Sequence, residues 1–172
     1  MGLKIYLARA MTGRVKAEVL AEALHDNHLV EGWGAIPLDP VTQEGIEAVP
    51  DIISAPETQL RQFWKRDKEM IREAHIVFDM SPKMKSEGVA HEVGYARYFL
   101  WKPVIRVYPS RDEIPAVSVA REEDDYLASS LIDALQYATM HYDTQRQRII
   151  WRWKLLKRCL WKFLVYQLGE WK

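Results

Sequence analysis

Short apolar runs alternate along the chain with longer segments in which apolar residues recur every three or four positions. The runs are rich in β-branched and aromatic residues, which predicts strands, and the periodic segments predict amphipathic helices. Strands are expected at 4–8, 36–41, 75–80, 103–108 and 117–119. Helices are expected at 15–24, 54–73, 86–100 and 125–141. Strands joined by helices of this length imply crossover connections, so the pattern predicts an α/β fold with a parallel sheet flanked by helices.

Five strands are typical of a small flavodoxin-like, or Rossmann-like, α/β domain. In such a sheet the ligand binds beyond the carboxyl ends of the strands, where the strand order reverses. The segments 6–14 and 79–92 and the loop after Tyr108 are expected at that edge. We therefore look for chemistry in these segments first.

A helix that begins near Ser86 is expected to direct its amino-terminal end at this edge. The first N–H groups of a helix lack intrahelical partners, and the helix dipole favours negative charge there. Glu92 lies in the second turn, where this field favours the ionised carboxylate. Asp67, on the preceding helix, and Asp79, at the end of the third strand, are candidates for a second carboxyl group. A carboxylate nucleophile with a second carboxyl group nearby suits glycosyl transfer, although most glutamates near helix ends are simply solvated.

Several strings of residues resemble the nucleoside 2-deoxyribosyltransferase family, which also contains nucleoside 5′-monophosphate N-glycosidases. They are Lys-Ile-Tyr-Leu-Ala at 4–8 with Thr-Gly-Arg at 12–14, Asp-Lys-Glu-Met-Ile at 67–71, Ala-His-Ile-Val-Phe-Asp-Met at 74–80, Ser-Glu-Gly-Val-Ala-His-Glu-Val-Gly-Tyr-Ala at 86–96 and Lys-Pro-Val-Ile at 102–105. The resemblance spans residues 3–140 in architecture but only these strings in motif. It implies that Glu92 attacks the anomeric carbon, that Asp67 positions or protonates the base, and that Tyr6 orients the nucleophile.

Ser86, six residues before Glu92, distinguishes two branches of that family. The resemblance implies Asp here in transferases that act on free nucleosides, where it holds the 5′-hydroxyl, and Ser in the monophosphate hydrolases. A carboxylate would repel a phosphate dianion, whereas a hydroxyl at a helix N-terminus can donate to it beside backbone N–H groups. The same serine can also serve as an N-cap of the helix. One hydroxyl can both cap the helix and donate to a phosphate. Glu87 departs from this scheme, because the carboxylate of Glu87 must point away from a bound phosphate.

The remaining candidates for substrate binding share a place at the expected ligand edge: Arg9, Gly13, Arg14, Gly88 and Asp79. Lys83 and Lys85 can add positive charge there. Thr12-Gly13-Arg14 lacks the spacing of a nucleotide-binding glycine motif, so a turn is favoured over a phosphate loop.

Histidine and tryptophan residues give weaker signals. His25 and His28 are three residues apart but have no obvious carboxylate partner, which favours solvated side chains over a metal site. His91 is expected to face away from the nucleophile and to be structural. Trp33 and Trp64 can stack on a base or belong to the core. Neither a cofactor nor a metal is expected.

Composition and charge set limits on the function. A chain of 172 residues that is 48% hydrophobic suits one domain with a sizeable core. A net charge of zero argues against a protein whose whole surface binds nucleic acid. The charge is nevertheless divided, because residues 145–172 carry eight basic residues and one acidic residue, a net +7, and residues 1–144 carry −7. We expect a catalytic domain at 1–143 and a basic, tryptophan-rich C-terminal amphipathic helix at 144–172.

This tail has an apolar seam, spaced by four and three residues, at Ile149, Trp153, Leu156, Leu160 and Phe163. Three interpretations are open: packing on the acidic body or on another subunit, contact with an anionic membrane surface, and contact with nucleic acid. A wide apolar face needs cover, so packing is favoured. The resemblance to the family named above, whose members act as oligomers, implies a homo-oligomer.

The single cysteine, Cys159, cannot form an internal disulfide, and the first residues lack the pattern of a signal peptide, which predicts a cytoplasmic protein. The function expected from these features is hydrolysis of the N-glycosidic bond of a (deoxy)nucleoside 5′-monophosphate, which releases the base and a sugar phosphate. One alternative is base exchange by a nucleoside 2-deoxyribosyltransferase. The alternative outside enzymology is a nucleotide-binding or membrane-docking module.

Overall fold

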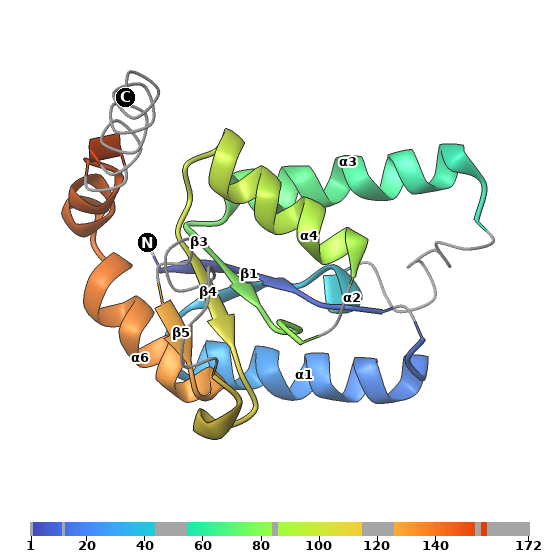
Figure 1. The fold of residues 1–172 in the computed structure, drawn as a ribbon, viewed down its shortest axis with the longest axis horizontal. Coiled ribbons are helices and arrows are strands. Elements are labelled where there is room, and N and C mark those ends of the chain that lie inside the picture. The colour runs from blue at the N-terminus through green and yellow to red at the C-terminus, as the bar shows by residue number, and fades with distance from the viewer. Residues whose placement is uncertain are drawn as a thin grey trace, which may run out of the picture.

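The computed structural model describes residues 2–11, 13–43, 55–83, 86–114, 126–153 and 156–157. Five strands form one parallel sheet in the order β2-β1-β3-β4-β5 (Figure 1). They are β1 (Lys4–Ala8), β2 (Ile36–Leu38), β3 (Ile76–Asp79), β4 (Val104–Val107) and β5 (Tyr126–Ala128). This is the flavodoxin-like strand order, so the predicted fold class is confirmed.

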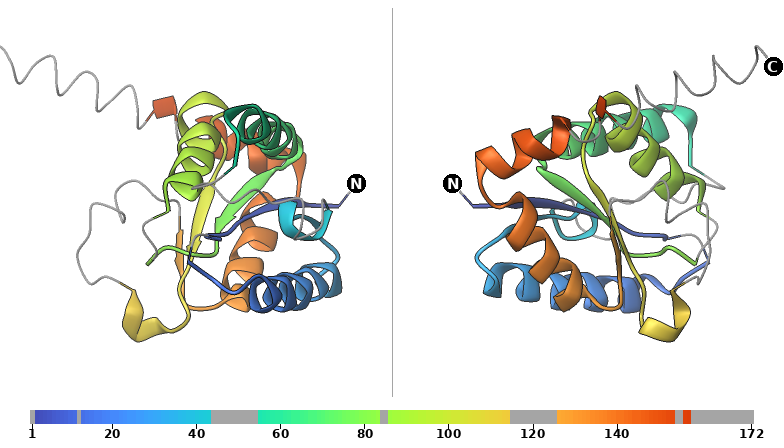
Figure 2. Two further views of the ribbon diagram at one scale, coloured as in Figure 1. Left: turned by 90° about the vertical axis from the view of Figure 1, so that its right-hand side faces the viewer. Right: turned by 60° about the vertical axis from the view of Figure 1, so that its left-hand side comes forward.

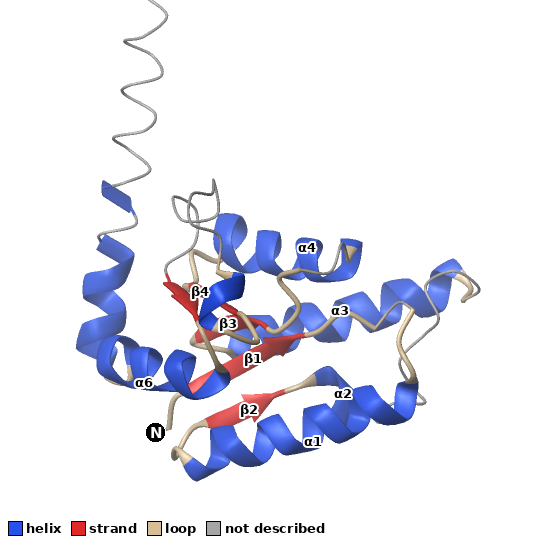
Figure 3. Ribbon diagram, turned by 60° about the horizontal axis from the view of Figure 1, so that its bottom comes forward, coloured by secondary structure: helices blue, strands red, loops and turns tan. Residues whose placement is uncertain are grey.

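Helices cover both faces of the sheet (Figures 1 and 2). The helices α1 (Lys16–Gly32) and α6 (Leu131–Tyr142) lie on one face, and α3 (Glu57–Glu73) and α4 (Glu87–Gly94) lie on the other. Two short helical segments follow strands: α2 (Pro40–Gln43) after β2, and η3 (Arg111–Glu113) after β4. Figure 3 shows α2 at the carboxyl end of β2, on the side where the ligand edge was expected.

The two-residue period of β1 decides which side chains reach each face of the sheet. Ile5 and Leu7 pack into the core formed with α1 and α6. Tyr6 and Ala8 pack into the core formed with α3 and α4, which also contains Ile71. Tyr6 is fully buried there, so its hydroxyl is directed between the sheet and the two helices that carry the acidic candidates.

The helix expected at 86–100 consists of two parts. Ser86 is the N-cap of α4, and its Oγ accepts a hydrogen bond from the backbone N of Val89 at 3.4 Å, so the N-cap interpretation is confirmed. After α4 the chain continues as one turn of π-helix, η2 (Tyr95–Phe99). The helix expected at 54–73 has its first residue outside the described residues, and α3 starts after Pro56.

The fifth strand lies where the pattern placed the start of a helix. The predicted strand 117–119 lies outside the described residues, whereas Tyr126–Ala128, expected to open a helix, forms β5 and pairs with β4. The helix begins only at Leu131, because Ser130 caps it by accepting a hydrogen bond from the backbone N of Asp133 at 3.1 Å. Two consecutive serines after a short apolar run thus separate strand from helix.

A further helical segment, residues 145–153, starts the tail beyond α6. Trp151 packs edge-on against Tyr142 with ring centroids 5.9 Å apart. On the opposite side Ile149, Trp153 and Leu156 are exposed. These three residues therefore do not pack on the body of the same chain, and packing on another subunit stays a prediction. Within the described ranges, no helix has both the length and the apolar character needed to cross a bilayer.

Candidate active site

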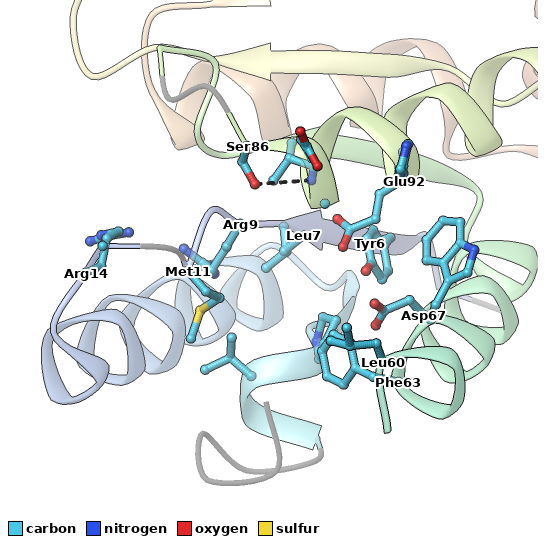
Figure 4. Close-up of a pocket in the computed structure, with 18 of the residues that line it drawn as sticks. Tyr6, Leu7, Arg9, Met11, Arg14, Leu60, Phe63, Asp67, Ser86 and Glu92 are labelled. Atoms are coloured by element: carbon cyan, nitrogen blue, oxygen red, sulfur yellow. Dashed lines mark hydrogen bonds between the residues drawn. The ribbon is translucent and has the colours of Figure 1, made fainter. Parts of the chain in front are cut away.

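A cavity of about 610 Å³ opens beside the carboxyl end of β1 (Figure 4). Its walls come from β1 and the turn after it, from α2, from residues 60–67 of α3 and from the first turns of α4. All but one of the residues predicted to bind or transform a substrate line it: Tyr6, Arg9, Gly13, Arg14, Asp67, Ser86, Gly88 and Glu92. The exception is Asp79.

Three side chains that can take part in proton or glycosyl transfer converge at the inner end of the cavity (Figure 4). Tyr6 comes from β1, Asp67 from α3 and Glu92 from α4. Asp67 is 2% exposed and Glu92 is 9% exposed, which is rare for carboxyl groups and requires a compensating interaction. The fold therefore brings together residues that are far apart in the sequence.

Burial changes the protonation of this group. It raises the pKa of Glu92 well above its usual range, and the neighbouring Asp67 carboxyl adds to the increase. The α4 dipole was expected to favour the ionised form of Glu92. Desolvation by burial outweighs that effect. Burial and the charge of Glu92 likewise raise the pKa of Tyr6, so its hydroxyl stays protonated. The negative charge of Asp67 thus favours the protonated form of Glu92.

Polar atoms at the inner end are not saturated by the protein. Among the described residues, Tyr6 Oη and Glu92 Oε2 are buried without a hydrogen bond of normal geometry. The Tyr6 hydroxyl nevertheless lies close enough to lower the pKa of Glu92, against the larger effects of burial and Asp67. Buried polar atoms are normally satisfied, so such a pair facing a cavity indicates a place for a ligand.

The amino-terminal turn of α4 forms another part of the lining. Ser86, Glu87 and Gly88 all contribute to it. The first intrahelical hydrogen bond runs from Ala90 N to Ser86 O, so the N–H groups of Glu87 and Gly88 precede the helical ladder. Glu87, whose charge a bound phosphate requires to point away, is exposed but also belongs to the lining.

The two arginines of the lining are held by acidic side chains. Arg9 is buried, with Nε donating to Asp39 at 3.0 Å and Nη1 donating to Asp26 at 2.8 Å. Arg14 donates to Glu22 at 2.5 Å. Asp39 was not singled out from the sequence, although an aspartate directly after a strand and before a proline is a turn signal. Arg9 therefore joins α1 to the end of β2 and carries little free positive charge.

Asp79 does not line the cavity, and the prediction that it contacts substrate is not supported by its position. Its Oδ1 accepts a hydrogen bond from the backbone N of Ser81 at 2.9 Å, and its Oδ2 lies 3.8 Å from Arg106 Nε. Asp79 therefore orders the loop after β3. Lys83 is exposed and pairs with Glu113 at 2.5 Å outside the cavity, and Lys85 lies outside the described residues.

The outer wall is apolar and aromatic, and most of it was not predicted. Leu60, Phe63 and Trp64 line the cavity from α3. Trp64 packs edge-on against Tyr95 with ring centroids 5.9 Å apart. His91 also lines the cavity, 6.4 Å from Trp64 between ring centroids, so the expectation that it faces away is wrong. The spacing Leu60, Phe63, Trp64 was visible as a helix face, but it does not distinguish a core face from a cavity wall.

Other aromatic and histidine candidates lie elsewhere. Trp33 follows α1, is exposed and does not line the cavity. His25 and His28 are exposed on α1. Among the described residues, no group of three or more metal-ligating side chains occurs.

The fold and site define a class: a doubly wound α/β protein with a tyrosine and two buried carboxyl groups at the carboxyl edge of its sheet. No family model matches the sequence, and no curated protein sequence matches it. Solved structures do match. A 2-deoxyribosyltransferase from Bacillus psychrosaccharolyticus is 20% identical, with a TM-score of 0.58 over 81% of this chain and 97% of that chain.

Two further structures extend the comparison. A 2-deoxyribosyltransferase from Leishmania mexicana is 19% identical, with a TM-score of 0.55 over 81% of this chain and 98% of that chain. A CMP N-glycosidase from Clostridium botulinum is 16% identical, with a TM-score of 0.44 over 80% of this chain and 98% of that chain. The two deoxyribosyltransferases share the fold of this chain over nearly their whole length.

Proposed function

We propose that this protein cleaves the N-glycosidic bond of a (deoxy)nucleoside 5′-monophosphate, with Glu92 as nucleophile. The observation that carries the proposal is the convergence of Tyr6, Asp67 and Glu92 at the inner end of a cavity of about 610 Å³. That volume suits a small organic ligand. The two deoxyribosyltransferases with the same fold are named for a reaction at the same bond, which supports this chemistry over other uses of paired carboxyl groups.

The carboxyl pair supplies both the nucleophile and the proton that the reaction needs. With the shared proton on Asp67, Glu92 is a carboxylate that attacks C1′ of the sugar through an oxocarbenium-like transition state. The bond from C1′ to the base nitrogen breaks, its electron pair stays on the base, and the base takes the proton of Asp67. Water then attacks C1′ of the glycosyl-enzyme, Asp67 accepts its proton, and Glu92 is released as a carboxylate.

Tyr6 is the residue that holds Glu92 in position. Because its raised pKa keeps the hydroxyl neutral, it can donate a hydrogen bond to the carboxylate form of Glu92. That hydrogen bond fixes one carboxyl oxygen and leaves the other directed at C1′. The partly unsatisfied state of both buried atoms suits a group that changes protonation during each turnover.

The outer parts of the cavity provide recognition. Phe63 and Trp64 offer apolar surface against which a planar base can stack. Ser86 and the N–H groups of Glu87 and Gly88 form the opposite part of the lining, where a 5′-phosphate can accept hydrogen bonds. The Ser86 hydroxyl can donate to a phosphate while it accepts from Val89 N, so the cap and the binding role are compatible.

The test is a screen of nucleosides and their 5′-monophosphates for release of the free base. Release from monophosphates by the wild-type protein, and its loss in Glu92→Gln, is the expected result. Adding a second free base distinguishes hydrolysis from base exchange, because exchange diverts the product from sugar phosphate to a new nucleotide. Tight nucleotide binding with no base released would instead support a binding module and contradict the proposal.

A further inference from the structure

The tail helix has two faces with different surroundings. Trp151 packs against Tyr142 of α6, and Arg148 Nη1 lies 3.0 Å from Nδ1 of His75. These contacts fix one face of residues 145–153 on the body. Successive helical residues are about 100° apart, so Ile149 and Trp153 lie on the side opposite Trp151. Both are exposed, and Trp153 retains 61% of its surface.

A second exposed apolar patch lies beside the start of the tail helix. It consists of Tyr98 and Phe99 at the end of η2 and of Trp101 just after it, and Phe99 is 74% exposed. Lys102 follows this patch. Burial lowers the pKa of Lys102, and the positive charge of Arg152 in the tail adds to the decrease, so the two side chains are near each other. Both views in Figure 2 place the end of η2 next to the tail helix. The two apolar surfaces therefore belong to the same end of the molecule.

The charges around the seam favour an anionic partner over a second tail. Residues 145–169 contain seven basic residues and no acidic residue. The four-three spacing of the seam could also pair two helices, but a parallel pair would place Arg152 of one tail opposite Lys157 of the other, a like-charge contact. Tryptophan beside Lys and Arg on an amphipathic helix is typical of segments that lie at the headgroup boundary of a bilayer.

We propose that the tail helix docks this protein on the surface of an anionic phospholipid bilayer. Ile149, Trp153 and Leu156 enter the boundary between headgroups and acyl chains, and the patch around Phe99 adds contact beside them. Arg152 and Lys157, both exposed, contact lipid phosphates. The cavity is lined by the carboxyl end of β1, by α2 and by the start of α4. These elements lie at the other end of the molecule from the tail (Figure 1), so docking leaves the cavity open to water.

The experiment is flotation of the full-length protein with two kinds of vesicle. One kind contains phosphatidylcholine mixed with phosphatidylglycerol, and the other contains phosphatidylcholine alone. We expect the protein to float with the anionic vesicles, to remain unbound with the neutral ones, and to lose binding as salt screens the charges. Equal binding to both kinds, or none to either, overturns the proposal.

Two variants, each with a matched control, test the residues that carry the proposal. Trp153→Glu is expected to weaken vesicle binding at least about tenfold, since a charge must enter the apolar boundary. Met140→Glu, on α6 and 63% exposed, introduces the same charge outside the tail and is expected to change binding little. Arg152→Glu is expected to weaken vesicle binding by about tenfold or more. Arg61→Glu makes the same charge change on the exposed surface of α3 and is expected to leave vesicle binding unchanged.

Three outcomes contradict the proposal for these variants. The first is that Trp153→Glu binds vesicles as the wild type does while its thermal melting shows it to be folded. The second is that the protein forms a dimer in light scattering that Trp153→Glu dissolves, with no vesicle binding, which would assign the seam to a second copy. The third is that duplex DNA binds more tightly than the vesicles at the same salt concentration. Base release in solution is independent of each, so it reports separately on the proposed activity.

Discussion

The two ends of the parallel sheet both bury ionisable side chains, but they treat them differently. At the amino end, Lys102 donates to the backbone carbonyls of Arg72 and Ala74, and His75 Nδ1 accepts a hydrogen bond from Lys4 N at 3.0 Å. At the carboxyl end, Tyr6 and Glu92 have buried polar atoms without such partners. The pKa is shifted at both ends: burial lowers the pKa of Lys102 to about 8 and raises that of Glu92.

A shifted pKa alone therefore does not identify an active site in this molecule. At the amino end, burial and nearby positive charges lower the pKa values of Lys102 and His75. Their hydrogen bonds hold the end of α3 and the start of the tail in place. At the carboxyl end, Tyr6 and Glu92 also have shifted pKa values, but these two side chains line a cavity and have unsatisfied polar atoms. A side chain with a shifted pKa becomes a catalytic candidate only when a substrate atom can reach it.

The largest expected effect tests the carboxyl end directly. Glu92→Gln keeps the shape of the side chain and removes the nucleophile, so base release is expected to fall by about a thousandfold or more. The same variant is expected to be more stable than wild type at neutral pH. Because the folded-state pKa of Glu92 is raised, its ionisation opposes folding as pH rises above its unfolded pKa, and glutamine does not ionise. Steady-state kinetics and chemical denaturation at neutral pH measure both.

Asp79→Asn is the matched control for that experiment. Asp79 is also a buried carboxyl group near the same edge, but it serves the loop after β3 rather than the cavity. We expect base release to be retained in the folded fraction. Equal losses of activity in both variants, measured on folded protein, would remove the distinction between Glu92 and its neighbours.

Ser86→Asp is expected to have the next largest effect. A carboxylate at the start of α4 repels a phosphate and removes a donor, at a cost of about 3 kcal/mol, or about a hundredfold in kcat/KM for monophosphates. Nucleosides without phosphate are expected to be affected far less. Measuring kcat/KM for a matched nucleoside and monophosphate gives the ratio, and an equal decrease for both would leave Ser86 with its capping role alone.

At the amino end, Trp151 and Trp153 of the tail are expected to contribute differently to the free energy of unfolding. Trp151→Ala removes the edge-on contact with Tyr142 and is expected to lower the free energy of unfolding by about 2 kcal/mol. Trp153→Ala removes an exposed side chain and is expected to change it by less than about 0.5 kcal/mol. Urea denaturation of the two variants compares them, and equal losses would show that the seam is covered in solution.

The smallest expected effect is a pH dependence of stability from His75. Burial and the nearby Arg148 lower its pKa from 6.5 to about 4. The folded state therefore binds this proton less well than the unfolded state, and stability that is complete above pH 6.5 is lost as pH falls toward 4. Because the side chain is only partly buried, we expect about 1 kcal/mol.

His75→Asn is the variant that isolates this effect. Its amide oxygen can accept the hydrogen bond of Lys4 N, but it does not titrate. We expect the difference in stability between wild type and His75→Asn to change across the interval between pH 6.5 and 4. Parallel stability curves, measured by denaturation at several pH values, would show that another group is responsible.

The sequence predicted the fold and the inner end of the site well, because both depend on local patterns. Strand periodicity places Tyr6 on a defined face, and the spacing of Ser86 and Glu92 along one helix is fixed by helix geometry. The position of Asp79 could not be predicted, since its carboxyl group is taken by the backbone of Ser81, a contact that depends on how the loop turns. Arg9 lines the cavity as predicted, but its pairing with Asp26 and Asp39 depends on elements far apart in the chain.

Strand β5 shows a different limit of prediction from the sequence. Tyr126, Leu127 and Ala128 fit a helix as well as a strand by their apolar character, and the pairing with β4 decides between the two. Likewise, the amphipathic pattern of the tail does not say which face meets the body. Trp151 does so because Tyr142, at the end of α6, offers an aromatic partner at that position.

The π-helical turn η2 sets the rotational phase between the proposed nucleophile and the surface patch. In an uninterrupted α-helix, Phe99 would lie seven residues after Glu92 and on the same side of the helix. Instead Ala96 and Arg97 are buried, and Phe99 is the most exposed large apolar side chain among the described residues. A π-turn holds one residue more than an α-turn. Deleting one residue within 95–98 would therefore replace the π-turn by an α-turn and keep the aromatic patch on its present side, with the frame of α4 up to Glu92 unchanged.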